Sequence, residues 1–237
     1  MKDKLFIIFI LFYTVLASAQ VAEVKNNPEY DEKPIHFGYT LGLNVMDFSF
    51  GRKGKPGDTL FADVGQLTPG FQVGMISDYR LGEYFNLRCL PSFNFGQRNL
   101  VYTIVKGNKR TLDTGGVFKI ESSMLDFPVL IKYKAKRINN YRPYVIAGGS
   151  FRWDLASKSK YDDNIKQWVL LKQADVYYEL GFGIDYYLPY FKLSTEIKLS
   201  EGLLDVLNHN PYKGQEQFVN SLNWIKSRII MFSLHFE

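Results

Sequence analysis

Apolar and polar side chains alternate with a period of two residues over most of the chain from residue 36 onward. In the clearest stretch, Val176, Leu180 and Phe182 alternate with Glu179 and Asp185. This period is typical of a β-strand whose two faces meet different surroundings. Eight segments follow it, and they span residues 37–45, 71–79, 85–95, 125–134, 144–155, 175–186, 191–199 and 229–236. The fold class is therefore predicted to be all-β.

The connections between these segments alternate between short and long. The short ones are residues 80–83, 135–141 and 188–190, and the long polar ones are residues 51–69, 97–119, 157–173 and 201–223. Outer-membrane barrels place short turns in the periplasm and long loops outside, and an even strand number puts both termini at the periplasmic end. Segments of about ten residues also fit a tilted membrane strand. We therefore predict a closed eight-stranded antiparallel transmembrane β-barrel in the outer membrane, with periplasmic termini and extracellular long loops.

The polar faces of the segments decide which side of the barrel meets lipid. A lipocalin, the soluble alternative, points its apolar faces inward around a ligand. Here the polar faces of the third to seventh segments are rich in charge, and they carry Arg88, Asp126, Lys132, Arg152, Asp154, Asp175, Glu179, Asp185, Lys192, Glu196 and Lys198. Charges in a narrow lumen need partners. We expect an ion-pair network that fills the lumen, an apolar face toward lipid, and no open pore.

Pro91 and Pro128 fall inside predicted strands, where each removes a ladder hydrogen bond. We expect them to mark bulges or bends near a barrel rim.

The N-terminus is typical of a signal peptide. Lys2 and Lys4 precede an apolar run over residues 5–16, and the small residues 17–19 (ASA) form a cleavage site. An anchoring helix is the alternative, but a membrane-spanning helix needs about 20 apolar residues. We predict a signal peptide over residues 1–19, a flexible periplasmic tether over residues 20–35 and the barrel over residues 36–237.

Composition adds few further constraints. The aromatic share is 16%, and most Tyr and Trp residues lie near segment ends. This placement predicts interfacial girdles rather than a sugar-binding platform, with candidates Tyr79, Tyr84, Tyr133, Tyr141, Trp153, Tyr186, Tyr187, Tyr190 and Trp224. The single cysteine, Cys89, excludes an intramolecular disulfide and a cysteine-rich metal site. The net charge of +5 comes from dispersed residues and does not indicate nucleic-acid binding.

Catalytic chemistry has few candidates. His36 and His235 are expected on neighbouring strands near the periplasmic rim, where they could form a metal or acid–base pair or simply meet water. A zinc site uses three or four ligands, so we favour the second interpretation. His209 lies in a turn-like part of a long loop, and Gly181 and Gly183 lack the third glycine of a dinucleotide site. The prediction is a non-enzymatic protein without cofactor or small-molecule substrate.

Several stretches resemble known families. Residues 125–133 (LDFPVLIKY), 142–149 (RPYVIAGG) and 181–186 (GFGIDY) resemble strands of small outer-membrane barrels from Bacteroidetes-type bacteria. A closer resemblance is to the PorT family of the type IX secretion system, and it rests on residues 137–144 (RINNYRPY), 151–156 (FRWDLA), 187–192 (YLPYFK), 196–198 (EIK) and 226–237 (KSRIIMFSLHFE).

The PorT resemblance implies a role in protein secretion across the outer membrane, and in gliding motility where that occurs. It implies outer-membrane lipid and other secretion-system components as partners, and it offers no catalytic residues. Two alternatives remain open. One is a general surface barrel for adhesion or envelope integrity, with its specificity in the long loops. The other is an outer-membrane hydrolase or acyltransferase.

Overall fold

The computed structural model describes residues 25–52, 60–65, 67–106, 109–111, 117–157, 170–210, 219 and 222–237. The predicted signal peptide and the first residues of the tether lie outside the described residues. Within these ranges, no helix has the length and apolar character needed to cross a membrane.

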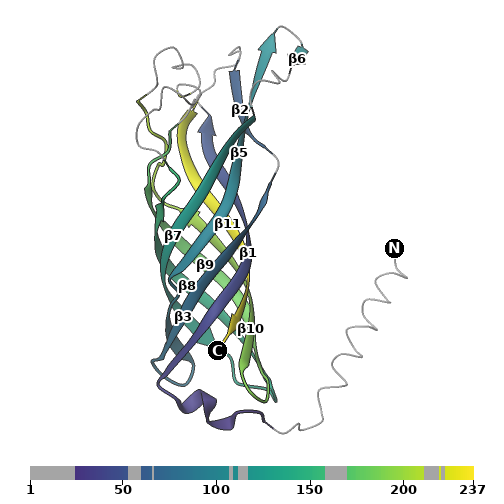
Figure 1. Ribbon diagram of the computed structural model, residues 1–237, viewed down its shortest axis with the longest axis vertical. Coiled ribbons are helices and arrows are strands. Elements are labelled where there is room, and N and C mark those ends of the chain that lie inside the picture. Colours follow the sequence, from purple (N-terminus) through teal and green to yellow (C-terminus); the bar gives the residue numbers. More distant parts are fainter. Residues whose placement is uncertain are drawn as a thin grey trace, which may run out of the picture.

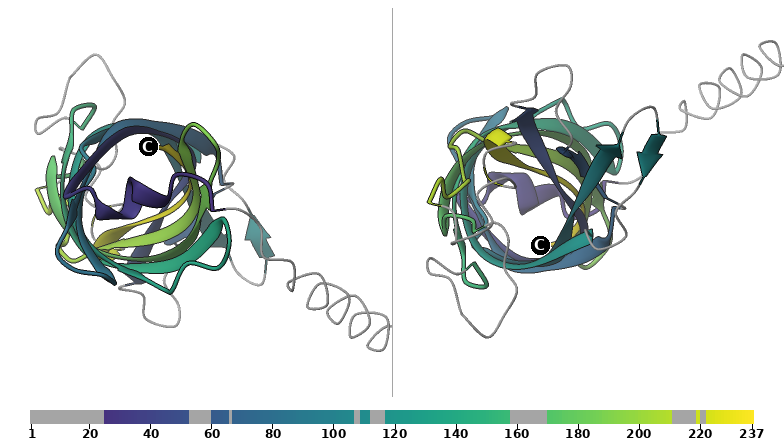
Figure 2. Two further views of the ribbon diagram at one scale, coloured as in Figure 1. Left: turned by 90° about the horizontal axis from the view of Figure 1, so that it is seen from below. Right: turned by 90° about the horizontal axis from the view of Figure 1, so that it is seen from above.

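The described chain folds into one antiparallel sheet that closes on itself (Figures 1 and 2). Its strands are β1 (Ile35–Arg52), β2 (Leu60–Val64), β3 (Pro69–Arg80), β4 (Phe85–Cys89), β5 (Ser92–Lys106), β6 (Lys109–Thr111), β7 (Val117–Lys134), β8 (Tyr141–Asp154), β9 (Ala174–Tyr187), β10 (Lys192–Gly202) and β11 (Leu222–Phe236). Consecutive strands pair from β7 to β11, and β1 pairs with both β11 and β3.

The ring contains eight wall positions because β4 and β5 share one of them. Both strands pair with β3 on one side and with β7 on the other. The predicted closed eight-stranded antiparallel barrel is therefore confirmed. We call the end with the short connections and the C-terminus the turn end, and the opposite end the loop end (Figure 1).

The strands continue farther toward the loop end than the alternating pattern indicated. Strand β5 runs to Lys106 and β7 begins at Val117, so most of the predicted loop over residues 97–119 is sheet. Strands β2 and β6 pair with the upper part of β5 and extend this side of the sheet (Figure 1). The outward positions Gln97 and Asn99 are polar. Where the outer face no longer meets lipid, the apolar alternation that identifies a membrane strand disappears.

The two prolines do not produce the expected bulges. The β4/β5 wall keeps one register against β7, since Cys89 pairs with Val129 and Ser92 pairs with Asp126. The Leu90 N–H donates to the Pro128 carbonyl at 3.3 Å. Pro91 therefore divides one wall into β4 and β5 without inserting a residue, and Pro128 leaves β7 unbroken. A proline removes a donor but keeps its carbonyl.

The outer wall is apolar and the inner wall is mostly polar, as predicted. Phe37 is 71% exposed and Phe182 is 58% exposed, whereas the adjacent inward residues His36 and Gly183 are buried. Most predicted girdle residues that the structure describes face outward, but Tyr187 points inward and is only 2% exposed. A lipocalin would have the reverse orientation, and the observed one is the orientation of a membrane barrel.

Candidate functional site in the filled lumen

The inner wall near the turn end is organised around Arg88 on β4. Its guanidinium contacts the carboxylates of Asp78 at 2.8 Å, Glu196 at 3.2 Å and Glu237 at 3.2 Å. All four side chains have essentially no exposure. These groups come from β3, β4, β10 and the C-terminal residue, so the cluster ties together walls that lie far apart in the sequence. Such burial is tolerated only when every charge is paired.

A second group of contacts extends this layer across the lumen. The Lys132 ammonium lies 2.7 Å from Asp185, which also accepts a hydrogen bond from Ser194 at 2.6 Å. The same ammonium sits 3.8 Å from the ring centre of Tyr144. The Lys192 ammonium pairs with Glu237 at 2.8 Å. The layer therefore links β7, β9, β10 and the C-terminus.

A further layer lies closer to the loop end and is organised around Arg152 on β8. Arg152 pairs with Asp126 at 3.0 Å and with Glu179. The Lys198 ammonium pairs with Glu179 at 2.8 Å. The Arg152 guanidinium also lies 4.1 Å from the ring centre of Tyr177, so it is held by charge on one side and by a π-face on the other.

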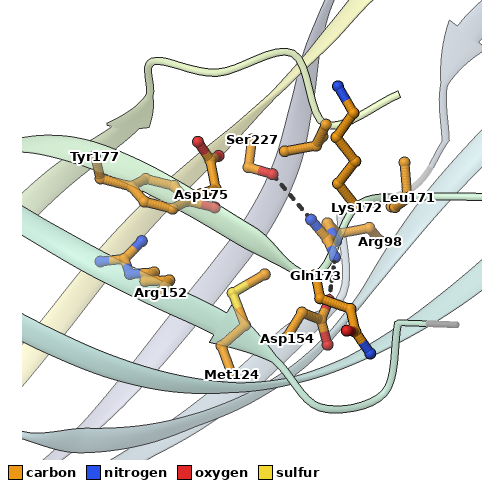
Figure 3. Close-up of a pocket in the computed structure, with 11 residues that line it drawn as sticks. Arg98, Met124, Arg152, Asp154, Leu171, Lys172, Gln173, Asp175, Tyr177 and Ser227 are labelled. Carbon is orange, nitrogen blue, oxygen red and sulfur yellow. Dashed lines mark hydrogen bonds and ion pairs between the residues drawn. The ribbon is translucent and has the colours of Figure 1, made fainter. Parts of the chain in front are cut away.

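The uppermost polar contacts surround a small cavity (Figure 3). The Arg98 guanidinium reaches Asp154 at 2.8 Å and Ser227 at 3.0 Å. Asp175 accepts hydrogen bonds from the N–H groups of Val176 and Leu204 rather than pairing with a cation. The cavity measures about 10 Å³, which is at the lower limit of the space that one water molecule needs. Side chains therefore fill this part of the barrel.

All eleven charges predicted for the lumen are buried on the inner wall: Arg88, Asp126, Lys132, Arg152, Asp154, Asp175, Glu179, Asp185, Lys192, Glu196 and Lys198. All of them except Asp175 form ion pairs. The sequence interpretation missed Asp78, Arg98 and Glu237. Asp78 lies on the polar face of the second segment, where its position was a usable signal, whereas Arg98 lies in a predicted loop and Glu237 follows the last strand.

The lumen also contains apolar side chains that the polar-face analysis did not anticipate. One buried cluster consists of Met46, Met124, Tyr177, Ile229 and Met231. It lies at the level of the charged layers, since Met231 is paired with Lys198 and Met124 with Asp154. Charged and apolar side chains therefore pack against each other at the same levels of the lumen.

His36 and His235 are not rim residues that meet water. His235 is 1% exposed, and its Nε2 lies 3.3 Å from Glu196. His36 is also buried and stacks on Tyr30 with ring centres 4.2 Å apart. His209 is exposed in a loop, 2.8 Å from Asp205. Among the described residues, no group of three or more His, Cys, Asp or Glu side chains has a geometry that could hold a metal ion.

The N-terminal segment closes the turn end instead of hanging free as a flexible tether. A short 3₁₀ helix, η2 (Pro28–Glu32), lies across the ring in the view from below (Figure 2). Asp31 pairs with Arg142 at 3.0 Å and accepts a hydrogen bond from the Tyr187 hydroxyl at 2.7 Å. Burial raises the pKa of the Tyr30 hydroxyl well above its ordinary value, so the group stays protonated and donates to Glu237.

An apolar cluster packs inside the loop end. Inward side chains of β1, β5 and β11, including Phe48, Leu100 and Ile225, contact two loop segments. Leu171 and Leu207 from these segments form a β-bridge with each other. Asp205 supports the arrangement by accepting hydrogen bonds from the backbone N–H groups of Leu207 and Ile225.

These features define a class of protein: a transmembrane β-barrel with an apolar outer wall and a lumen filled by side chains. The family comparison agrees with the geometry. Residues 18–208 match the family model described as outer membrane protein beta-barrel domain, and the chain belongs to that family. A comparison with curated proteins finds no match.

Solved outer-membrane proteins also resemble the chain at low sequence identity. Neisserial surface protein A is 12% identical with a TM-score of 0.43, and the match covers 86% of this chain and 98% of that one. OprG from Pseudomonas aeruginosa is 16% identical with a TM-score of 0.40, covering 84% and 92%. Ail of Yersinia pestis, in complex with a heparin analogue, is 12% identical with a TM-score of 0.37, covering 84% and 96%.

Proposed function

We propose that this protein is a PorT-like, non-enzymatic component of the type IX secretion system that acts as a scaffold or assembly factor in the outer membrane. Its termini face the periplasm and its long loops face the exterior. The assignment to this system is supported by the PorT-like stretches, among them residues 151–156 (FRWDLA) and 187–192 (YLPYFK).

The observation that carries the scaffold role is the closure of the lumen at three levels. Helix η2 covers the turn end, the ion pairs of Arg88 and Arg152 cross the middle, and the cluster around Leu207 packs at the loop end. A secreted polypeptide would have to break these contacts, and separating one buried ion pair costs about 3–5 kcal/mol. Cargo therefore passes through a partner, and this barrel presents its loops and turns to that partner.

Deletion of the gene tests the secretion role. We expect loss of secreted cargo with an unchanged envelope, and restoration by the wild-type gene supplied in trans. Intact secretion in the deletion strain would eliminate the proposal. A leaky envelope together with normal secretion would support the rival surface role.

Single-channel recording tests the closed lumen separately. The purified barrel in a planar bilayer is expected to give no steady conductance. Large, steady ohmic steps from the isolated protein would refute the closed lumen and indicate a small porin.

The rival function is a general surface barrel for adhesion or envelope integrity. It is favoured by the part of the sheet that extends beyond the ring at the loop end, built from β2, β6 and the upper part of β5 (Figure 1). Replacing residues 102–116 by a short turn joins the paired positions Val101 and Val117, keeps the ring of strands and discriminates the two functions. Loss of adhesion with intact secretion would support the surface role, and loss of secretion would support the scaffold role.

A further inference from the structure

The outer face of β8 forms a trough in the apolar belt. Its consecutive outward residues are small over one stretch: Pro143, Val145, Ala147 and Gly149. Strands β7 and β9 lie directly on either side of β8 (Figure 1).

Bulky side chains on these neighbours form two ridges. The registers place Ala147 between Ile131 and Leu180, and they place Gly149 between Val129 and Tyr178. All four flanking side chains are between 40% and 52% exposed, so they stand out from the wall. The floor of the trough is therefore the width of one strand, β8, and the outward side chains of β7 and β9 rise on either side of it.

The trough deepens toward the turn end. There a depression of about 420 Å³ is lined by apolar groups of Tyr133, Ala135, Pro143, Val145, Phe182 and Ile184. Its size falls within the range of about 300–1,000 Å³ that small-molecule sites occupy. The exposed Lys136 follows Ala135 directly, so a cation stands at the turn end of an otherwise apolar groove.

The width of the trough selects its occupant. Neighbouring strands lie about 4.8 Å apart, so the axes of β7 and β9 are separated by about 10 Å, and their side chains narrow the gap further. A helix with its side chains is about 10–12 Å across and is too wide. An extended peptide would leave backbone groups unpaired in lipid. A hydrocarbon chain has neither problem.

We propose that the trough along β8 binds one acyl chain of a glycerophospholipid, with the lipid phosphate against Lys136. The inference rests on the membrane-barrel class and does not depend on the secretion role. A bound lipid would fill the depression and smooth the outer wall where β7, β8 and β9 meet.

Native mass spectrometry of the full-length mature barrel in detergent tests this site, with palmitoyl-oleoyl phosphatidylglycerol as the probe. The wild-type barrel is expected to show saturable binding of one lipid. Ala147→Phe fills the trough between the ridges and is expected to weaken binding at least tenfold. Ser77→Phe, which adds the same bulk to the outer face of β3, is expected to leave binding unchanged.

Two further variants keep the test decisive. Val145→Leu adds less bulk to the same floor and serves as the trough variant if Ala147→Phe does not fold. It is expected to weaken lipid binding several-fold. Lys136→Glu keeps the trough but reverses the charge, and it is expected to weaken binding of the anionic lipid several-fold. The proposal is overturned if the wild type binds no lipid saturably, or if both trough variants bind as well as Ser77→Phe.

Discussion

Replacement of Arg88 by Met is the most informative perturbation of the lumen. The guanidinium is the shared partner of three buried carboxylates, and Met fills a similar volume without charge. Removal of the guanidinium does not leave the three carboxylates with equally good remaining partners. Glu237 keeps Lys192 at 2.8 Å, and Glu196 keeps the Tyr144 hydroxyl at 2.9 Å.

Asp78 loses the most stabilising contacts, because among the described residues the side-chain donor left to it is Asn86 at 2.7 Å. Removing one partner of a buried ion pair destabilises a protein by about 3–5 kcal/mol. We therefore expect Arg88→Met to lower the free energy of unfolding by about that amount. The double variant Arg88→Met/Asp78→Asn removes the stranded carboxylate and is expected to recover about half of the loss, because a neutral group costs less to bury than an unpaired ion.

Equilibrium unfolding in urea of the barrel refolded into lipid vesicles measures these differences, with the wild type and Ser77→Phe as references. Surface changes are usually within about 0.5 kcal/mol of the wild type. A change of that small size for Arg88→Met would refute the view that the lumen is a mutually dependent ion network. So would a double variant that is less stable than Arg88→Met alone.

Three further predictions concern other parts of the barrel. Gly148→Ala is expected to cost about 1–3 kcal/mol of unfolding free energy, because its Cβ would lie 2.2 Å from a backbone oxygen. Gly82→Ala, whose Cβ would meet no atom within 4 Å, is the control in the same urea assay. Asp31→Ala is expected to release η2 from the barrel and to lower the free energy of holding it there by about 1–3 kcal/mol. Hydrogen exchange over residues 26–32 should then become faster, and unchanged exchange would show that this carboxylate does not hold η2. Burial raises the pKa of Asp205, but the hydrogen bond from the Ile225 N–H and other donors outweigh burial and lower it below its ordinary value of 3.8. The loop contacts of Asp205 are therefore fully present above pH 3.8 and lost as the pH falls through the lowered pKa. The Ile225 amide should be less protected from hydrogen exchange below that pKa than above pH 3.8. Equal protection at all pH values would contradict this prediction.

The wall of the barrel was predictable from the sequence because it obeys a local rule. Each membrane strand meets lipid on one face and the lumen on the other, so its period of two is visible without knowledge of its neighbours. Val176 to Tyr186 illustrates this, since every second side chain in that stretch of β9 faces outward as expected. The same rule predicts that Arg152 and Glu179 point inward, and both are buried.

The pattern weakens where that local rule no longer applies. The sequence of the upper part of β5 predicts a loop, because beyond the apolar belt both faces of a strand can be polar. The bulges expected at Pro91 and Pro128 do not occur, because each carbonyl can still accept a hydrogen bond from a neighbouring strand. Both errors concern interactions with the surroundings or with another strand, which a single segment does not encode.

By itself, the sequence determined the all-β class, the number of wall positions, the outward apolar face and the set of side chains that point inward. Only the tertiary structure decided which charges pair, that Asp78 and Glu237 share Arg88, and that η2 and Leu207 pack at opposite ends of the lumen. The physical reason is the separation along the sequence of the residues that each property involves. Alternation is a property of neighbouring residues in one strand, whereas ion pairing and closure depend on the register and curvature that bring distant strands around a common axis.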